Sequence, residues 1–272
     1  MSATTLTRPV PRSARTDGTR TPPAPIPFGR VVGVEMRKTF DTRAGLWLMV
    51  GIGVVAVLAT AAVILWAPDE VLTYETFGTA IGAPMAMLLP VVAILAVTAE
   101  WSQRTGLSTF TLVPRRGRTI AAKAVVTLVV GVLSMVVAMA VGALGAWLGP
   151  TIRGIEPTFD LGLDQIGTLV LAQVLGMFVG FMLGVLTRSS AVAIVGYFLF
   201  NALLPTLTSL LAALQDWFRD VQPWVDFSYT QGTLYEGGLS ATEWAQLGVT
   251  GVIWLVVPLA IGLWALLRSE IK

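Results

Sequence analysis

Six stretches of the chain are apolar and long enough to cross a lipid bilayer, and this feature restricts the possible folds more than any other. They cover residues 45–66, 77–99, 119–148, 166–187, 191–214 and 244–267. A helix needs about 20 residues to cross a hydrocarbon core of about 30 Å. Only 12% of the residues are charged, about half the share found in soluble domains. The sequence therefore predicts an all-α membrane protein with six transmembrane helices within residues 44–272.

Basic and acidic residues are segregated to opposite sides of these predicted spans. The side that holds the N-terminus has 16 of the 18 lysines and arginines, and the other side keeps only Arg153 and Arg219. That other side has 11 of the 16 acids: Asp69, Glu70, Glu75, Glu156, Asp160, Asp164, Asp216, Asp220, Asp226, Glu236 and Glu243. Because short loops rich in lysine and arginine stay in the cytoplasm, we expect both termini there.

The chain before the first span has two parts. Residues 1–27 are rich in threonine, proline and arginine and have little to bury, so we expect a disordered cytoplasmic tail. Residues 28–43 read as an amphipathic helix, with an apolar row opposite a charged face. The row is Phe28, Val32, Met36 and Phe40, and the charged face is Arg30, Glu35, Arg37, Lys38 and Asp41. Such a helix lies in the headgroup plane; the alternative is an ordinary basic tail beside the membrane.

The last predicted outer loop, residues 215–243, is the longest and is rich in aromatic side chains. They are Trp217, Phe218, Trp224, Phe227, Tyr229 and Tyr235. The whole loop favours a cap or re-entrant segment at the headgroup level, whereas any single aromatic residue fits a simple interfacial belt.

The sequence lacks the residues that several kinds of catalytic site require. The chain has no cysteine and no histidine, so zinc-peptidase and triad sites are not expected. A phosphate-binding loop needs a lysine after glycine, and none of the three lysines follows one. We therefore predict no catalytic, metal or cofactor site in this chain. A lipid-modifying enzyme would need acids gathered at one membrane face, but the expected cytoplasmic acids are scattered.

The predicted spans contain no aspartate or glutamate. Ionisable groups inside the membrane are the usual mark of ion-coupled carriers, so their absence opposes that mechanism. Gln173 and Asn201 are polar residues that could line a pathway, although hydrogen bonding between helices is the simpler role. Gly176, Gly180 and Gly184 form a row that permits close helix approach, either within one subunit or at a dimer face. We expect four prolines to bend their helices: Pro84, Pro90, Pro205 and Pro258.

Residues 100–118, between the second and third spans, form the most distinctive polar segment. An acid begins it, an apolar row with Arg104 follows, and a basic cluster comes after Pro114. These residues are Glu100, Arg104, Leu107, Phe110, Leu112, Arg115 and Arg116. A short amphipathic helix here could lodge in a groove of a partner protein, with Glu100 pairing with the arginines. Charge alone favours the simpler view that the arginines are a topology signal.

The stretch AEWSQRTGLSTFTLVPRRGRTIAAK, residues 99–123, resembles membrane subunits of bacterial ABC exporters of the type-2 class. In that family an acid ends the second span, a short coupling helix follows, and a lysine opens the third span. The resemblance assigns these places to Glu100, residues 105–112 and Lys123, and it makes residues 28–43 the family's interfacial connecting helix. It implies two separate ATPase subunits, which hold ATP and Mg²⁺, and a second permease copy or paralogue. The translocation path would lie between the two permeases.

The sequence thus predicts the permease subunit of an ATP-driven exporter in the bacterial plasma membrane. It does no covalent chemistry itself, and a separate ATPase docks on residues 100–118. An ion-coupled secondary transporter is the alternative, and a lipid-modifying membrane enzyme is a weaker one.

Overall fold

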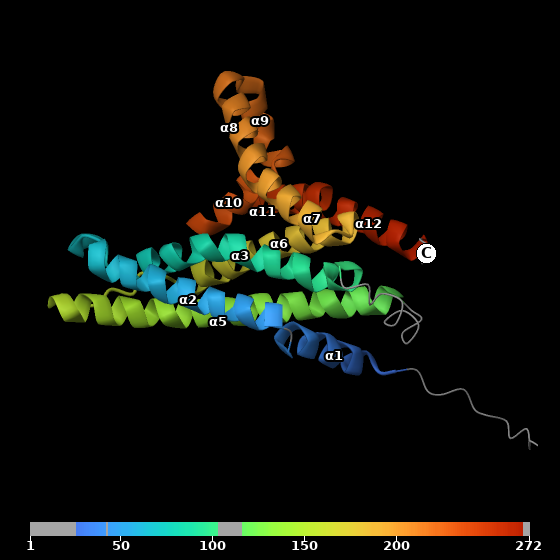
Figure 1. The fold of residues 1–272 in the computed structure, drawn as a ribbon. Helices are drawn as coiled ribbons and strands as arrows, with labels where there is room; N and C mark the ends of the chain where they lie inside the picture. The colour runs from blue at the N-terminus through green and yellow to red at the C-terminus, as the bar shows by residue number, and fades with distance from the viewer. Residues whose placement is uncertain (1–25, 42, 103–115, 269–272) are drawn as a thin grey trace, which may run out of the picture.

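The computed structural model describes residues 26–41, 43–102 and 116–268 (Figure 1). Within these ranges the chain is helical and contains no β-strand. The α-helices are α1 (Phe28–Asp41), α2 (Arg43–Trp66), α3 (Tyr74–Ser102), α5 (Arg116–Arg153), α6 (Leu163–Thr187), α7 (Ser190–Phe198), α8 (Leu204–Leu214), α9 (Asp216–Val225), α10 (Phe227–Glu236), α11 (Ala241–Gly251) and α12 (Val257–Arg268). Short π-helical segments, Leu199–Leu203 and Val252–Val256, join α7 to α8 and α11 to α12.

The prediction of six long apolar helices is confirmed. Six helical stretches in the described ranges are long and apolar enough to cross a membrane, and each overlaps one predicted span. The third is longer than expected, because α5 continues to Arg153. It stops where Gly154 takes a left-handed backbone with φ of 74°, a conformation that glycine adopts without steric cost.

Helix α3 lies at the centre of the bundle, packed against α2, α5 and α6 (Figure 1). Ile81, Met85 and Leu89 recur every fourth residue on α3 and are buried. They belong to one apolar core that also includes Val130 of α5 and Phe181 of α6. Every fourth residue falls on one face of a helix, so this face of α3 is set by the sequence pattern.

The glycine row on α6 packs inside this subunit, as the simpler prediction expected. A methyl group added at Gly180 would lie 2.6 Å from the carbonyl oxygen of Pro90, and one added at Gly184 would meet Val97. Both partners belong to α3. The absence of side chains at Gly180 and Gly184 therefore lets the two backbones approach closely.

Two of the predicted proline bends coincide with changes of helix type. Pro205 and Pro258 each follow the end of a π-helical segment by two residues. A proline has no N–H for the carbonyl four residues earlier, and its ring collides with that carbonyl. The wider π turn accommodates this carbonyl, which belongs to Asn201 in one span and Trp254 in the other.

The two ends of the bundle differ in the charges that they carry. At one end, which we call the basic end, α1, the end of α3, the start of α5 and the end of α12 lie together (Figure 1). At the opposite end, the acidic end, lie residues 67–73 and 154–162, which contain four acids: Asp69, Glu70, Glu156 and Asp160. Both described ends of the chain thus lie at the basic end. The cytoplasmic location of this end is still a prediction.

Residues 215–243 form two helices, where the sequence suggested an aromatic-rich loop. α8 and α9 lie side by side and project from the bundle (Figure 1). α10 turns back and packs against α6 and α11. Asp226 starts α10, because its buried carboxylate accepts hydrogen bonds from the backbone N–H groups of Ser228 and Tyr229.

Helix α1 corrects one prediction. We assigned Glu35 to its water-facing side, but only 4% of Glu35 is exposed and the residue faces α5. Phe28 and Phe40, assigned to the apolar face, are 39% and 41% exposed. The helix packs through Val31 and Glu35 together with the middle of the predicted row, Val32 and Met36, whereas the two ends of that row stay uncovered. A location of α1 at the membrane interface is still a prediction.

Candidate functional site

The predicted coupling segment begins and ends at the basic end of the bundle. Glu100 lies in the last turn of α3 and Arg116 begins α5. These helices pack against each other, so the segment links two neighbouring central helices. The other predicted residues lie outside the described residues: Arg104, Leu107, Phe110, Leu112 and Arg115. The suggested pairing of Glu100 with the arginines lies outside them as well.

A buried ion pair joins three helices close to this segment. Lys123 of α5 donates to the Glu35 carboxylate of α1 at 2.8 Å and to the Ala96 carbonyl of α3 at 2.9 Å. Glu35 and Lys123 are each only 4% exposed. Lys38 donates to the other carboxylate oxygen at 2.7 Å. We call Glu35, Lys123 and the Ala96 carbonyl the basic-end clamp.

The carboxylate of Glu35 remains ionised although it is buried. Burial acts to raise the pKa of Glu35, since it disfavours the charged form. The ammonium groups of Lys123 and Lys38 outweigh this effect and hold the pKa of Glu35 below its ordinary value of 4.5. At neutral pH the Glu35 carboxylate is therefore charged, and its contact with Lys123 ties α1 to α5.

A second polar cluster lies in the middle of the bundle and contains both predicted pathway residues. Gln173 of α6 donates to the Gly82 carbonyl of α3 at 3.1 Å, which is the interhelical bond expected for it. Asn201 is linked to α3 through Tyr197, to whose hydroxyl it donates at 2.6 Å. Gln173 and Asn201 both line one cavity of about 100 Å³. The structure thus brings the two residues together.

The Tyr197 hydroxyl replaces the backbone hydrogen-bond donor that α3 lacks at Pro90. A proline at position 90 has no N–H to donate to the carbonyl of Ala86, four residues earlier on α3. The Tyr197 hydroxyl donates to this carbonyl at 2.7 Å. The sequence analysis did not identify Tyr197, although Pro90 in an apolar helix was a signal that an outside donor was needed.

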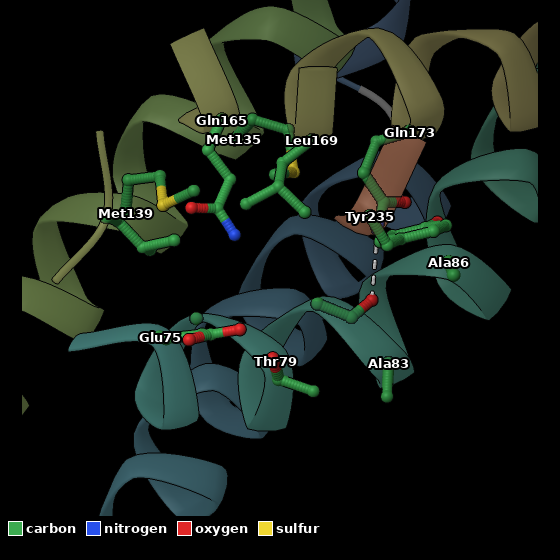
Figure 2. Close-up of a pocket in the computed structure, with 13 residues that line it drawn as sticks. Glu75, Thr79, Ala83, Ala86, Met135, Met139, Gln165, Leu169, Gln173 and Tyr235 are labelled. Carbon is green, nitrogen blue, oxygen red and sulfur yellow. Dashed lines mark hydrogen bonds between the residues drawn. The ribbon is translucent and has the colours of Figure 1, made fainter. Parts of the chain in front are cut away.

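A larger cavity, of about 310 Å³, opens between α3, α5 and α6 and shares Gln173 with the smaller one (Figure 2). Glu75 and Thr79 line it from α3, and Gln165 and Leu169 from α6, while Tyr235 closes one end from α10. Gly78 and Gly82 of α3 also line it and provide room, because they have no side chains.

The cavity was not predicted from the sequence. Glu75 was counted only as an acid of an outer loop, Gln165 was not considered, and Tyr235 was counted only as an aromatic loop residue. They come from three helices, so no local pattern places them together. The available signal was the pair of glycines four residues apart at the start of α3.

Comparison with known proteins does not identify a family for this chain: no protein-family model matches it, and no curated protein sequence matches it. The fold and these sites define a class, a multi-pass helical membrane protein with a buried ionic clamp at one end and a cavity toward the other.

Proposed function

We propose that this chain is the permease subunit of an ATP-driven ABC exporter and that a separate ATPase docks on residues 100–118. The observation that carries the proposal is the place of this segment. It connects α3 to α5 at the basic end, and α3 contacts α2, α5 and α6. A displacement of the segment by a partner would therefore be transmitted through α3 to the helices that pack against it.

The basic-end clamp supports the same proposal. It ties α3, α5 and α1 together at Lys123, which lies seven residues after the start of α5. Rigid secondary elements joined by buried contacts can pass a displacement from one site to another. The clamp would make the three helices respond as a unit to a partner on residues 100–118.

The charge distribution supports an external source of energy. Within the described spans, charged side chains lie only within about two turns of a span end. Ion-coupled carriers usually keep ionisable groups deeper in the membrane. The sequence also has no phosphate-binding loop of its own. ATP and Mg²⁺ would be held by the partner ATPase.

The assembly that we propose has two ATPase subunits and two permeases, either two copies of this chain or this chain and a paralogue. It would sit in the bacterial plasma membrane with the basic end in the cytoplasm. The translocation path would lie between the two permeases.

Two substitutions in the segment test the docking site. Glu100→Ala and Phe110→Asp should each uncouple ATP hydrolysis from export while the protein still inserts. Thr109→Asp is the matched control for the second, because it adds the same charge beside the apolar row. Transport and ATPase rates would be measured in vesicles that contain the whole assembly. Full coupling in both variants would refute a docking role for this segment.

A gentle purification tests the class. The protein should co-purify with an ATPase, and its transport should require ATP. If it is isolated alone and transports without any nucleotide-hydrolysing partner, the proposed function is wrong and a secondary transporter replaces it.

A further inference from the structure

The larger cavity has the size and shape of a small-molecule site. Along α3 it extends from Glu75 to Ala86, about 16 Å of helix. Its volume of about 310 Å³ is at the lower end of the range for ligand pockets, roughly 300–1,000 Å³. The cavity belongs to one subunit, so it is distinct from a path between two permeases.

Most of its wall is apolar and adaptable. Met135 and Met139 of α5, Leu169 of α6 and Ala83 of α3 face the space. Methionine side chains are unbranched and polarisable, so they adjust to ligands of different shape. Such a wall suits the apolar body of a ligand.

One lining residue carries a charge, the acid Glu75 at the acidic-end side of the cavity. Among the described residues its carboxylate has no ion pair, and the nearest contact shown is another acid: the Glu75 backbone N–H donates to Asp160 at 2.9 Å. The two arginines of the outer segments are engaged elsewhere, Arg153 with Asp69 at 2.6 Å and Arg219 with Asp216 at 3.1 Å. Glu75 is exposed to solvent, and among the described lining residues its carboxylate is the charge that a cation entering the cavity would meet.

The remaining polar groups add hydrogen-bond acceptors. The Gln165 amide lies beside the cavity across from Glu75 (Figure 2). Gln173 uses its N–H₂ group on Gly82, which leaves its carbonyl oxygen as an acceptor. In the smaller cavity the Ser228 hydroxyl is buried with no hydrogen-bond partner among the described residues. The Gln165 amide and the Ser228 hydroxyl can donate as well as accept, so the charge of Glu75 is what favours a cation over an anion.

We propose that this cavity binds an organic ammonium ion with an apolar body, whose cation pairs with Glu75 and whose body lies along Met135, Met139 and Leu169. Binding itself needs only this chain. The step from binding to export rests on the proposed function. The same ammonium chemistry could come from a free amine or from the headgroup of an ethanolamine lipid.

The test measures binding to the full chain in phosphatidylglycerol nanodiscs, whose headgroup has no ammonium, with empty nanodiscs as the baseline. The probes are 4-phenylbutylammonium and its neutral counterpart 4-phenylbutanol, which differ mainly in charge. We expect calorimetry to show tighter binding of the cation. Glu75→Gln should lower the affinity for the cation about fivefold, which is the upper end for an exposed ion pair. It should leave the affinity for the alcohol unchanged.

Two further variants complete the test. Glu70→Gln removes the same charge from the same end of the bundle, but residue 70 does not line the cavity. This variant should therefore bind both probes as the unchanged protein does. Gly82→Leu should abolish binding of both probes, because it fills the cavity from α3. Replacing half of the lipid with phosphatidylethanolamine distinguishes the sources. The lower surface charge weakens probe binding to every variant alike, so a further loss of affinity in the unchanged protein that Glu75→Gln does not show would identify the lipid headgroup as the natural ammonium.

The proposal is overturned if neither probe binds above the empty nanodiscs. It is also overturned if both bind equally and Glu75→Gln alters neither, since the cavity would then be a purely apolar space. None of these measurements involves an ATPase, so failure here would leave the proposed function to its own tests.

Discussion

Glu35 and Lys123 show how a charge can be buried in this chain. Each would be costly to bury alone, and the pair is tolerated because the carboxylate and the ammonium lie 2.8 Å apart and both have further hydrogen bonds. The pair is a weak source of net stability but a strong constraint on how α1 meets α3 and α5.

Removing one partner of the clamp should therefore destabilise the protein strongly. Glu35→Ala removes the carboxylate that lies 2.8 Å from the buried Lys123 ammonium, and breaking a buried pair costs about 3–5 kcal/mol. Equilibrium unfolding in detergent would measure the loss. The double variant Glu35→Leu with Lys123→Met should recover stability close to that of the unchanged protein, because an apolar pair of similar volume needs no desolvation of charge. A double variant as unstable as Glu35→Ala would contradict this account.

The clamp also predicts a dependence of stability on pH. The folded-state pKa of Glu35 is lower than its ordinary value of 4.5, so the folded protein binds fewer protons at this group than the unfolded chain does. Its contribution is complete above the unfolded pKa and is lost as the pH falls through the folded pKa. Melting temperatures measured from pH 7 down to pH 3 should fall below about pH 4.5.

Glu35→Gln is the control for this pH effect, since it removes the titrating group and keeps the shape. It should start from a lower melting temperature and lose less between pH 5 and pH 3. Parallel curves for the two proteins would show that other carboxylates cause the acid loss.

Pro90 of α3 and Tyr197 of α7 act as one structural element. The proline provides no N–H for the Ala86 carbonyl, and the tyrosine hydroxyl donates to this carbonyl at 2.7 Å instead. A backbone carbonyl within an apolar span needs a hydrogen-bond donor, and here the neighbouring helix provides it. The bond thereby fixes where α7 crosses α3.

Tyr197→Phe should cost about 1–3 kcal/mol, because it leaves a buried carbonyl without a donor. Adding Pro90→Ala to this variant should recover part of the loss, since the new N–H of residue 90 can bond the Ala86 carbonyl within α3. Pro90→Ala alone is the control and should not show this gain. Unfolding measurements on the four proteins give the coupling, and additive effects would disprove the pairing.

The whole molecule has a basic end and an acidic end, and we expect its orientation in the membrane to follow from them. The chain contains no cysteine, so a single introduced cysteine reports on one position only. Glu70→Cys at the acidic end should react with a membrane-impermeant maleimide in intact cells. Arg37→Cys on α1 should react only after the cells are permeabilised. The reverse pattern would invert the predicted topology.

The candidate sites were less predictable than the spans, and particular residues show why. Gln173 makes the predicted bond because a polar side chain in an apolar helix has few other partners than a neighbouring helix. Glu35 was assigned to the wrong face because the helical period of residues 28–40 carries no information about Lys123, 88 residues later. Glu75, Gln165 and Tyr235 come from three helices, and their meeting depends on the order in which these helices pack.

By itself, the sequence determined the six helical spans, the separation of basic from acidic loops and the lack of charge deep in the spans. These properties depend on runs of consecutive residues, because the exclusion of polar groups from lipid acts on each segment separately. Only the tertiary structure decided that Glu35 meets Lys123, that Tyr197 bonds the Ala86 carbonyl, and that Glu75 opens on a cavity. These contacts depend on which helix faces meet, and the glycines of α6 and the prolines of the spans set those faces through close packing between distant segments.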